Sequence, residues 1–438
     1  MIGALAAAAL ALAAPAPPQV AVSARPGSQA ETTIAASPTD PAVLLAASNT
    51  ARGDTFGTLA YTSTDAGATW TTSEPFPSDG KSCAIGDPVV AIDDTGRELA
   101  GYLTTPCADS EFEAKISLYV STRVGPAEPW TPVLVADPAA GSNDKPALAW
   151  DVSPASPHHG RAYLAWNRIV RNRLTLVLSH SDDSGATWSA PAPLAPAAGG
   201  GAFFVGLAVA PTGELYADWV DGVRQIQVAR SADGGDSFGP AVFAGGTAGL
   251  PSLNCRLNGI GIPAQSHRCV TPSPSIVAGP DKVVVAYAAA GSNGAQLDVR
   301  VIAFDLALQP LGRAVRAHPA DGKVAADQFQ PVLALDAHSG LLWLCFYDTR
   351  GDRTRRTVRF VCTASRDGQT WVVPATAASV RSNETRRPAS GFQFGDYQGL
   401  AVGADGVAHP IWTDSRALAR LGEEIYTTAL APALLGFG

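Results

Sequence analysis

Charged residues are scarce in this chain and are not clustered. They make up 16% of the 438 positions, against 46% hydrophobic residues, and the net charge is −8. A chain with this much apolar material can bury a large core, which excludes intrinsic disorder. The basic residues are scattered along the sequence, which disfavours nucleic acid and anionic membranes as partners.

An apolar run long enough to span a membrane is also lacking at the start of the chain. The run from Met1 to Ala14 is rich in alanine and is followed by Pro15 and Ala16. It is shorter than the roughly 20 residues that a bilayer requires, whereas an apolar stretch before small residues is typical of a signal peptide. We therefore expect residues 1–16 to be a signal peptide and residues 17–438 to form one secreted domain without membrane contact.

Cysteine motifs of the zinc-binding type are absent, because no Cys-x-x-Cys or Cys/His cluster occurs. The six cysteines instead suggest three local disulfides: Cys83 with Cys107, Cys255 with Cys269, and Cys345 with Cys362. Six cysteines allow 15 connectivities, so these pairings are hypotheses. Each short loop would contribute about 3 kcal/mol if closed. Two apolar runs flank a polar turn between Cys345 and Cys362, and a hairpin there would place the two cysteines opposite each other.

Helical periodicity is missing as well, and a repeat of about sixty residues takes its place. A short apolar run recurs seven times, centred on Ile34, Val90, Leu148, Leu207, Ile276, Leu333 and Leu400. A second β-prone run follows each of these, and six of the second runs end in an aromatic residue: Tyr102, Trp166, Trp219, Tyr287, Tyr347 and Trp412. Four short strands per unit, joined by turns, predict an all-β, seven-bladed β-propeller of four-stranded antiparallel blades.

The seventh unit ends after its third strand, near Leu430. An unassigned β-prone stretch, Gln19 to Ser23, precedes the first unit. Joining this stretch to the last blade would remove an exposed sheet edge. The sequence therefore predicts a ring closed by an N-terminal strand.

A turn motif recurs where the third strand of a unit meets the fourth. It reads Ser-x-Asp-x-Gly-x-Thr-Trp at residues 63–70 and 181–188, with variants at 231–238 and 365–371. In such a turn Asp accepts backbone N–H bonds, Gly supplies a positive φ and Trp packs as an apolar peg. These are Asp boxes, and the chain beyond its leader resembles the sialidase-like (BNR/Asp-box repeat) β-propeller superfamily. The resemblance implies that Asp65 and Asp183 are structural and lie on the face opposite the ligand site.

The ligand-binding face of a propeller gathers the starts of the innermost strands and the loops between second and third strands. Four aspartates precede innermost strands: Asp87, Asp144, Asp327 and Asp396. Arg168, Arg350 and Arg416 follow second strands at similar offsets. Two interpretations of these arginines remain. They converge to bind a substrate carboxylate in bidentate fashion, or each pairs with a neighbouring Asp and stabilises the blades.

The resemblance also suggests catalytic residues. The segment from Gly395 to Leu400 looks like the part of sialidases that carries the nucleophilic tyrosine, which makes Tyr397 the candidate nucleophile. A phenol has a pKa near 10, so a nearby Glu would have to act as its base. Glu384, Glu423 and Glu424 are the candidates on nearby loops, and a simple packing role for Tyr397 is the alternative. Asp87 is a candidate general acid, together with Asp54, Asp109 and Glu111, and Asp396 and Asp144 are candidate substrate-binding residues.

The sequence departs from sialidases in two respects. The Arg-Ile-Pro signature is replaced by the segment that contains Glu31, and seven units stand against the usual six blades. Three functions remain open: a secreted glycoside hydrolase acting on sialic-acid-like or other acidic sugars, a non-catalytic propeller that binds a glycan or protein, and a structural protein of the cell surface. A carbohydrate or glycoconjugate is the expected partner. No complete calcium loop is present, so no metal and no cofactor are predicted. A polar hairpin tip explains the tripeptide Arg350-Gly351-Asp352.

Overall fold

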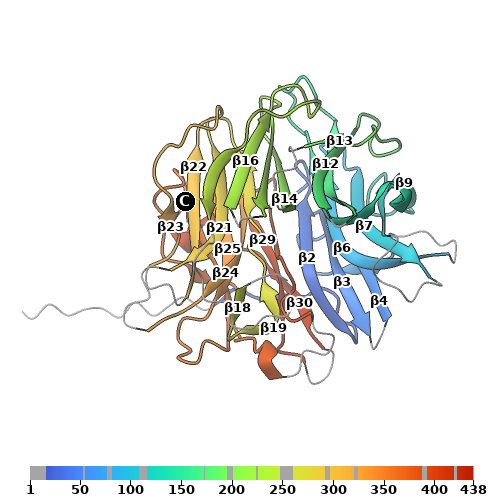
Figure 1. The fold of residues 1–438 in the computed structure, drawn as a ribbon. Helices are drawn as coiled ribbons and strands as arrows, with labels where there is room; N and C mark the ends of the chain where they lie inside the picture. Colours follow the sequence, from blue (N-terminus) through green and yellow to red (C-terminus); the bar gives the residue numbers. More distant parts are fainter. Residues whose placement is uncertain are drawn as a thin grey trace, which may run out of the picture.

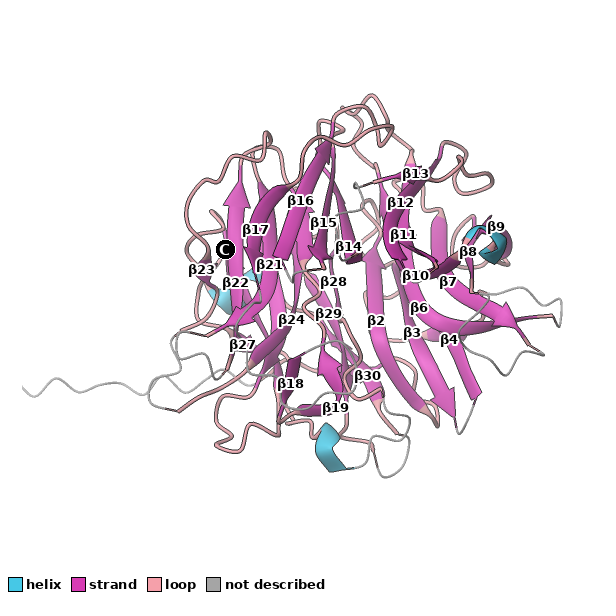
Figure 2. Cartoon of the chain, in the orientation of Figure 1, coloured by secondary structure: helices cyan, strands magenta, loops and turns pink. Residues whose placement is uncertain are grey.

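The structure is a computed structural model. It describes residues 16–52, 55–75, 81–107, 116–171, 173–194, 201–222, 225–246, 260–291, 296–319, 324–386, 392–418 and 422–437. These residues form seven four-stranded antiparallel sheets, one two-stranded hairpin and three short 3-10 helices (Figures 1 and 2). The predicted all-β fold with seven four-stranded blades is thereby confirmed. The predicted signal peptide falls almost entirely outside the described residues, of which only Ala16 belongs to it.

The first four blades follow the chain from the innermost to the outermost strand. Blade 1 is β2 (Ser28–Ala36), β3 (Leu44–Arg52), β4 (Thr55–Ser63) and β5 (Thr71–Ser73). Blade 2 is β6 (Ser82–Ile92), β7 (Glu98–Pro106), β8 (Ser117–Arg123) and β9 (Thr131–Ala136), and the 3-10 helix η1 (Pro138–Ala140) follows it. Blade 3 is β10 (Ser142–Trp150), β11 (Ala162–Val170), β12 (Arg173–Ser181) and β13 (Ala192–Pro193). Blade 4 is β14 (Ala202–Val209), β15 (Leu215–Asp221), β16 (Gln225–Ser231) and β17 (Val242–Gly246).

A hairpin of β18 (Ile260–Ile262) and β19 (Gln265–Val270) separates blades 4 and 5 in the chain. Blade 5 is β20 (Ser275–Ala278), β21 (Val283–Ala290), β22 (Leu297–Phe304) and β23 (Val315–Arg316). Blade 6 is β24 (Gln328–Leu335), β25 (Leu342–Asp348), β26 (Arg359–Ser365) and β27 (Ala375–Thr376), followed by the 3-10 helix η2 (Glu384–Arg386). Blade 7 is β28 (Gly399–Val402), β29 (Ala408–Asp414) and β30 (Glu424–Thr428) with β1 (Gln19–Ala21), and η3 (Pro432–Leu435) ends the chain.

The seven blades form a closed ring. Each innermost strand contacts the innermost strands of the two adjacent blades, and β2 of blade 1 contacts β28 of blade 7. Figure 1 shows this closure as blue β2 lying near red β29 and β30. β1 pairs antiparallel with β30, with Gln19 opposite Thr428 and Ala21 opposite Tyr426. The prediction that an N-terminal strand completes the last blade is confirmed.

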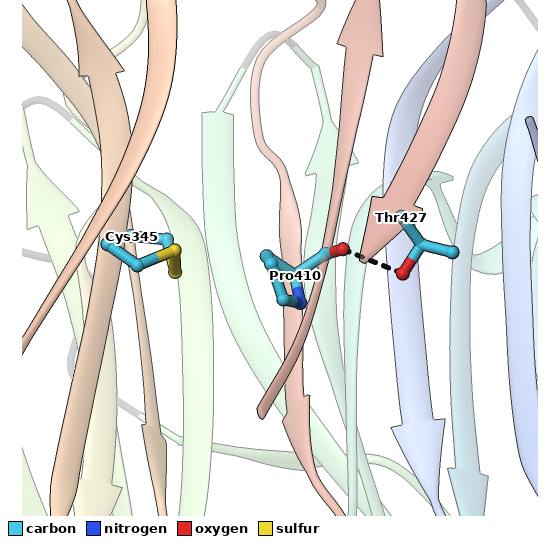
Figure 3. Close-up of a disulfide and its surroundings, with 4 residues drawn as sticks. Cys345, Pro410 and Thr427 are labelled. Atoms are coloured by element: carbon cyan, nitrogen blue, oxygen red, sulfur yellow. Dashed lines mark hydrogen bonds between the residues drawn. A yellow bond between two sulfur atoms is a disulfide. The ribbon is translucent and has the colours of Figure 1, made fainter. Parts of the chain in front are cut away.

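Two of the three predicted disulfides are formed between described residues. Cys83 is bonded to Cys107, and Cys345 is bonded to Cys362, its direct partner across β25 and β26. Figure 3 shows Cys345 beside blade 7, where the Thr427 hydroxyl donates to the Pro410 carbonyl at 2.8 Å. Cys269 is also disulfide-bonded, and its predicted partner, Cys255, lies outside the described residues.

The four turns that resemble Asp boxes share one hydrogen-bond pattern. In the first, the Asp65 carboxylate accepts from the backbone N–H of Thr69 at 2.8 Å and from its hydroxyl at 2.6 Å. The Ser63 hydroxyl donates to the same carboxylate and accepts from Gly67 N–H. Corresponding bonds recur at Asp183, Asp233 and Asp367. All four turns connect third and fourth strands, so the ring topology places them on the face opposite the starts of the innermost strands.

Apolar side chains fill the spaces between neighbouring sheets, and the large aromatics of second strands, such as Trp166 and Trp412, are fully buried. One buried acid interrupts this packing. Asp218 on β15 lies opposite Gly206 on β14, and a Cβ at Gly206 would collide with the Asp218 carboxyl. Burial raises the pKa of Asp218 to about 8. The carboxyl therefore carries a proton in the folded protein at neutral pH.

Asp218→Asn should change how stability depends on pH. Because the pKa of Asp218 is raised by folding, the folded state binds the proton more tightly than the unfolded chain, and this stability is lost as pH rises from about 4 to about 8. Asn cannot ionise, so the variant does not lose this stability. The free energy of unfolding of the variant, relative to that of the wild type, should therefore rise by up to about 1.4 kcal/mol per pH unit in that window. Urea unfolding at pH 5, 6.5 and 8 measures this gain. The exposed Asp281→Asn is the control, and parallel pH curves for wild type and Asp218→Asn would contradict the assignment.

Candidate functional site

The starts of the innermost strands supply one equivalent residue from each blade. This residue lies three positions before the repeated apolar residue of each unit, and the seven together are called the axial ring: Glu31, Asp87, Lys145, Phe204, Ser273, Gln330 and Tyr397. The polypeptide is locally irregular at most of these positions. At five of them the strand-pairing register shifts and the backbone φ lies between 47° and 56°. These five are Glu31, Asp87, Lys145, Phe204 and Gln330. β-Bulges of this kind redirect a side chain, and left-handed backbone at non-glycine residues is concentrated at functional sites.

Three acidic side chains surround Lys145. Its Nζ lies 2.8 Å from Asp396 Oδ2, 3.0 Å from Asp87 Oδ1 and 3.7 Å from Glu31 Oε2. These residues come from blades 1, 2 and 3 and from the segment before blade 7, so the ring closure brings them together. With Arg268 they are called the axial charge cluster: Glu31, Asp87, Lys145, Arg268 and Asp396.

Arg268 reaches the cluster from the β18–β19 hairpin, which lies at the lower end of the molecule in Figure 1. Its guanidinium donates to both oxygens of Asp396, at 3.0 Å and 2.7 Å, and to Glu31. The hairpin is anchored beside blade 7, because the Gln265 side chain donates to the Gly395 carbonyl at 2.9 Å. Of the five cluster side chains, that of Arg268 is the most exposed, at 19%.

The protonation of the cluster follows from burial and from the two cations. Burial raises the pKa of Glu31 to about 8, although the charges of Arg268 and Lys145 act to lower it. Burial also raises the pKa of Asp87, against the charge of Lys145. For Asp396 burial is outweighed by Lys145 and Arg268, which hold its pKa well below the usual range. Glu31 is therefore protonated at neutral pH while Asp396 is ionised.

Tyr397 lies beside this cluster. Lys145 Nζ is 5.5 Å from the centre of the Tyr397 ring. Burial, followed by the charges of Asp87 and Glu31, raises the pKa of the phenol well above its usual range. The phenol is thus neutral in the resting protein, and it would need a proton acceptor in order to act as a nucleophile.

Two cavities meet at Lys145. One, of about 400 Å³, is lined by all five residues of the axial charge cluster and by Asp144, Phe56 and Phe392 among others. The second, of about 210 Å³, is lined by Tyr397, Lys145, Phe204 and Ser273 together with neighbouring residues of the innermost strands. The first volume falls within the range of small-molecule sites.

Comparison with known proteins relates this fold to sialidases. No family model and no curated protein sequence matches the chain. The leech intramolecular trans-sialidase, in a structure with 2,7-anhydro-Neu5Ac, is similar with a TM-score of 0.51 and 11% identity, covering 82% of this chain and 68% of its own. This likeness shows the fold alone. The fold is that of a sialidase-like propeller.

Two further structures are similar at lower TM-scores. The Ruminococcus gnavus intramolecular trans-sialidase has a TM-score of 0.49 and 12% identity, covering 95% of this chain and 97% of its own. The Trypanosoma rangeli sialidase has a TM-score of 0.46 and 14% identity, covering 93% of this chain and 55% of its own.

In this sialidase-like propeller the three predicted arginines do not line either axial cavity. Arg350 pairs with Asp348, and Arg416 pairs with Asp414 at 2.6 Å. The guanidinium of Arg168 lies 5.6 Å from the centre of the Trp166 ring. Of the predicted site residues, the structure brings together Tyr397, Asp87, Asp144 and Asp396 around Lys145. The arginines stay in their own blades, Arg168 within β11 and Arg350 and Arg416 in the loops after β25 and β29.

Glu384 also lies elsewhere. It is fully buried at η2, and burial followed by the charges of Glu423 and Asp414 raises its pKa well above the usual range. The acids whose charges act on Tyr397 are Asp87, Glu31 and Asp396. Three other predicted acids, Asp54, Asp109 and Glu111, lie outside the described residues.

Sequence reasoning missed Glu31, Lys145 and Arg268. The first two occupy the axial-ring position of their units, so aligning the seven repeats at that position would have identified them. Arg268 has no such signal, because the β18–β19 hairpin is an insertion between blades.

The described part of the chain shows neither a metal centre nor a membrane segment. Within it, no group of three or more His, Cys, Asp or Glu side chains is arranged to hold a metal ion. No helix among the described residues is long and apolar enough to cross a bilayer.

Proposed function

We propose that the protein is a secreted, sialidase-like glycoside hydrolase that cleaves acidic sugars at the axial cavity. The observation that carries this proposal is the placement of Tyr397 beside Lys145 and the carboxyl groups of Asp87 and Glu31, at the meeting point of two cavities. A nucleophile beside two carboxyl groups, one of which is held protonated, is the arrangement that a retaining glycosidase requires.

In the first step Tyr397 Oη would attack the anomeric carbon, and its proton would pass to Asp87. The glycosidic oxygen would leave with the proton of Glu31, whose pKa near 8 keeps it protonated at neutral pH. In the second step Glu31, now ionised, would take a proton from water, and the hydroxide would attack the anomeric carbon and break its bond to Tyr397. Asp87 would return its proton to the released phenolate, which restores the resting protein. The charge of Lys145 would stabilise Asp87 as the carboxylate that accepts the Tyr397 proton in the first step.

Two features support an acidic sugar. Arg268 and Lys145 are the cations of the axial charge cluster, and a guanidinium can bind a carboxylate in bidentate fashion. With Glu31 protonated, the carboxylates of the cluster do not outnumber its two cations, Lys145 and Arg268, so the cluster does not repel an anion. A substrate carboxylate would approach Arg268, the most exposed member.

Glu31→Gln should reduce turnover of an aryl-glycoside panel of acidic sugars by about 10²- to 10⁴-fold, because the amide cannot donate the catalytic proton. Wild-type kcat/KM should fall as pH rises through about 8, where Glu31 loses its proton, and this fall should be absent from the residual activity of the variant. Steady-state kinetics from pH 5 to 9.5 measure both effects.

Glu214→Gln is the matched control. Glu214 pairs with Arg230 at 3.0 Å in a loop on the opposite face, so its replacement should leave kinetics unchanged. Absence of wild-type turnover on every acidic glycoside would refute the hydrolase proposal.

A non-catalytic glycan-binding or protein-binding propeller is the second candidate. The observation that favours it is the neutral, buried phenol of Tyr397 within a network whose charges are already paired. A glycan array on which wild type and Tyr397→Phe bind alike, without turnover by either, would support this function over the first.

Export is part of the proposal. It rests on the signal-peptide pattern of residues 1–16 and on the disulfides, which persist in oxidising compartments. Expression of the full chain should yield a shortened protein outside the cytoplasm, detected by N-terminal sequencing.

A further inference from the structure

The loop between β25 and β26 is unusually basic for an acidic protein. Residues 348–359 contain five arginines and two aspartates, a local charge of +3 in a chain of net charge −8. This segment is called the basic loop. It connects the second and third strands of blade 6, so it lies on the same face as the axial cavity.

Asp352 organises the basic loop from within. Its carboxylate accepts from the backbone N–H and hydroxyl of Thr354, both at 2.8 Å, and from the backbone N–H and hydroxyl of Thr357, also at 2.8 Å. It accepts a further bond from Arg356 N–H at 3.1 Å. These bonds lower the pKa of Asp352 well below its usual range despite some burial. Asp352 is thus a scaffold for the loop rather than a free carboxylate.

The five arginines of the basic loop fall into two groups, the second of which also includes Arg381, whose guanidinium donates to the carbonyls of Arg350 and Thr357. Arg350 and Arg355 are neutralised by Asp348 and Asp327. Arg353 and Arg356 are exposed, and Arg359 and Arg381 are partly buried. These last four form no ion pair with any residue that the structure describes.

Arg359 lies close enough to Arg381 to disfavour the charge of Arg381. Burial, followed by the charge of Arg359, lowers the pKa of Arg381, and the opposing effects of Asp352 and Asp348 do not restore it. Two like charges held together in this way are stabilised by an added anion.

A polar pocket adjoins these arginines. Its volume is about 560 Å³, and its lining is Gly351, Asp352, Thr354, Arg356, Thr357, Asn383 and Thr385. Hydroxyl and amide groups of this kind bind sugar hydroxyls, whereas single-stranded nucleic acid is bound largely by stacking on aromatic rings. None of the described lining residues is aromatic.

We propose that the basic loop and Arg381 form a second binding surface, for an anionic polysaccharide chain. Arg353, Arg356 and Arg381 contact its acidic groups, because guanidinium groups match carboxylate and sulfate geometry, and the threonines and Asn383 contact its hydroxyls. The idea that the bound polysaccharide leads to the axial cavity rests on the proposed function. The binding of the polysaccharide to the basic loop does not.

The test compares two double variants of the full-length protein. Arg353→Ser/Arg356→Ser removes two charges from the basic loop, and Arg313→Ser/Arg366→Ser removes two exposed charges from turns between third and fourth strands, on the opposite face. Binding of heparin, polygalacturonate, dextran and single-stranded DNA is measured by calorimetry at low and at high salt. Heparin and polygalacturonate represent the sulfated and the carboxylated sources.

The basic-loop variant should bind the preferred anionic polysaccharide roughly tenfold more weakly than wild type at low salt and show a smaller salt dependence, whereas the control variant should change affinity less than about twofold. Three results would overturn the proposal. They are an equal loss of affinity in both variants, wild-type affinity for dextran as high as for the anionic polysaccharides, and wild-type affinity for DNA higher than for them. Retained polysaccharide binding without glycoside turnover would refute the hydrolase function alone.

Discussion

Replacing Tyr397 with Phe should reduce glycoside turnover by at least about 10³-fold, because removal of a covalent nucleophile leaves only binding and electrostatic contributions. The ring of Phe fills the same space beside Lys145, so the free energy of unfolding should change by less than about 0.5 kcal/mol. Single-turnover kinetics with an activated aryl glycoside, together with urea unfolding, separate the two effects.

Tyr119→Phe is the control for this substitution. Tyr119 lies on β8, stacked on Tyr102 at 6.2 Å between ring centres, and it lines neither axial cavity. Its replacement should leave turnover intact. If Tyr397→Phe hydrolysed glycosides as fast as wild type, another group would have to be the nucleophile.

Replacing Lys145 with Met should destabilise the fold by about 3–5 kcal/mol, because it leaves Asp87 and Asp396 buried without their shared counter-charge. Without that charge the folded-state pKa of Asp87, which burial already raises, rises further, and the pKa of Asp396 rises from its lowered value. The loss of stability in the variant, relative to wild type, should therefore be largest above about pH 5 and should become smaller as pH falls towards 4. Urea unfolding at several pH values measures this recovery.

Lys282→Met is the matched control. Lys282 pairs at 3.1 Å with Asp281, whose side chain is 66% exposed, and such surface pairs contribute about 0–1 kcal/mol. If Lys145→Met lowered the free energy of unfolding as little as Lys282→Met does, or by an amount that does not depend on pH, the axial charge cluster would not stabilise the fold.

The fold was predictable because its signals are local and repeated. The apolar runs around Ile34 to Leu400 mark innermost strands, and the four Ser-x-Asp turns mark connections to outer strands. Ring closure followed from the missing fourth strand of the last unit, and β1 supplies that strand. The pairing of Cys345 with Cys362 followed from hairpin register.

The site was only partly predictable, because its contacts depend on how the blades face one another. Position along each repeat indicated Asp87, Asp396 and Tyr397, and these meet at the axis. The same reasoning placed Arg350 and Arg416 on the correct face without showing that Asp348 and Asp414 bind them within their own loops. Arg268 belongs to an inserted hairpin, whose direction the repeat does not specify.

A double-mutant cycle between Lys145 and Asp396 most directly measures whether distant blades gather these side chains at one point. The two residues are separated by most of the ring in sequence, and their charged atoms lie 2.8 Å apart. Unfolding free energies of Lys145→Met, Asp396→Asn and the double variant should give a coupling of about 1–3 kcal/mol. Additivity within about 0.5 kcal/mol would contradict the contact, and with it the axial site.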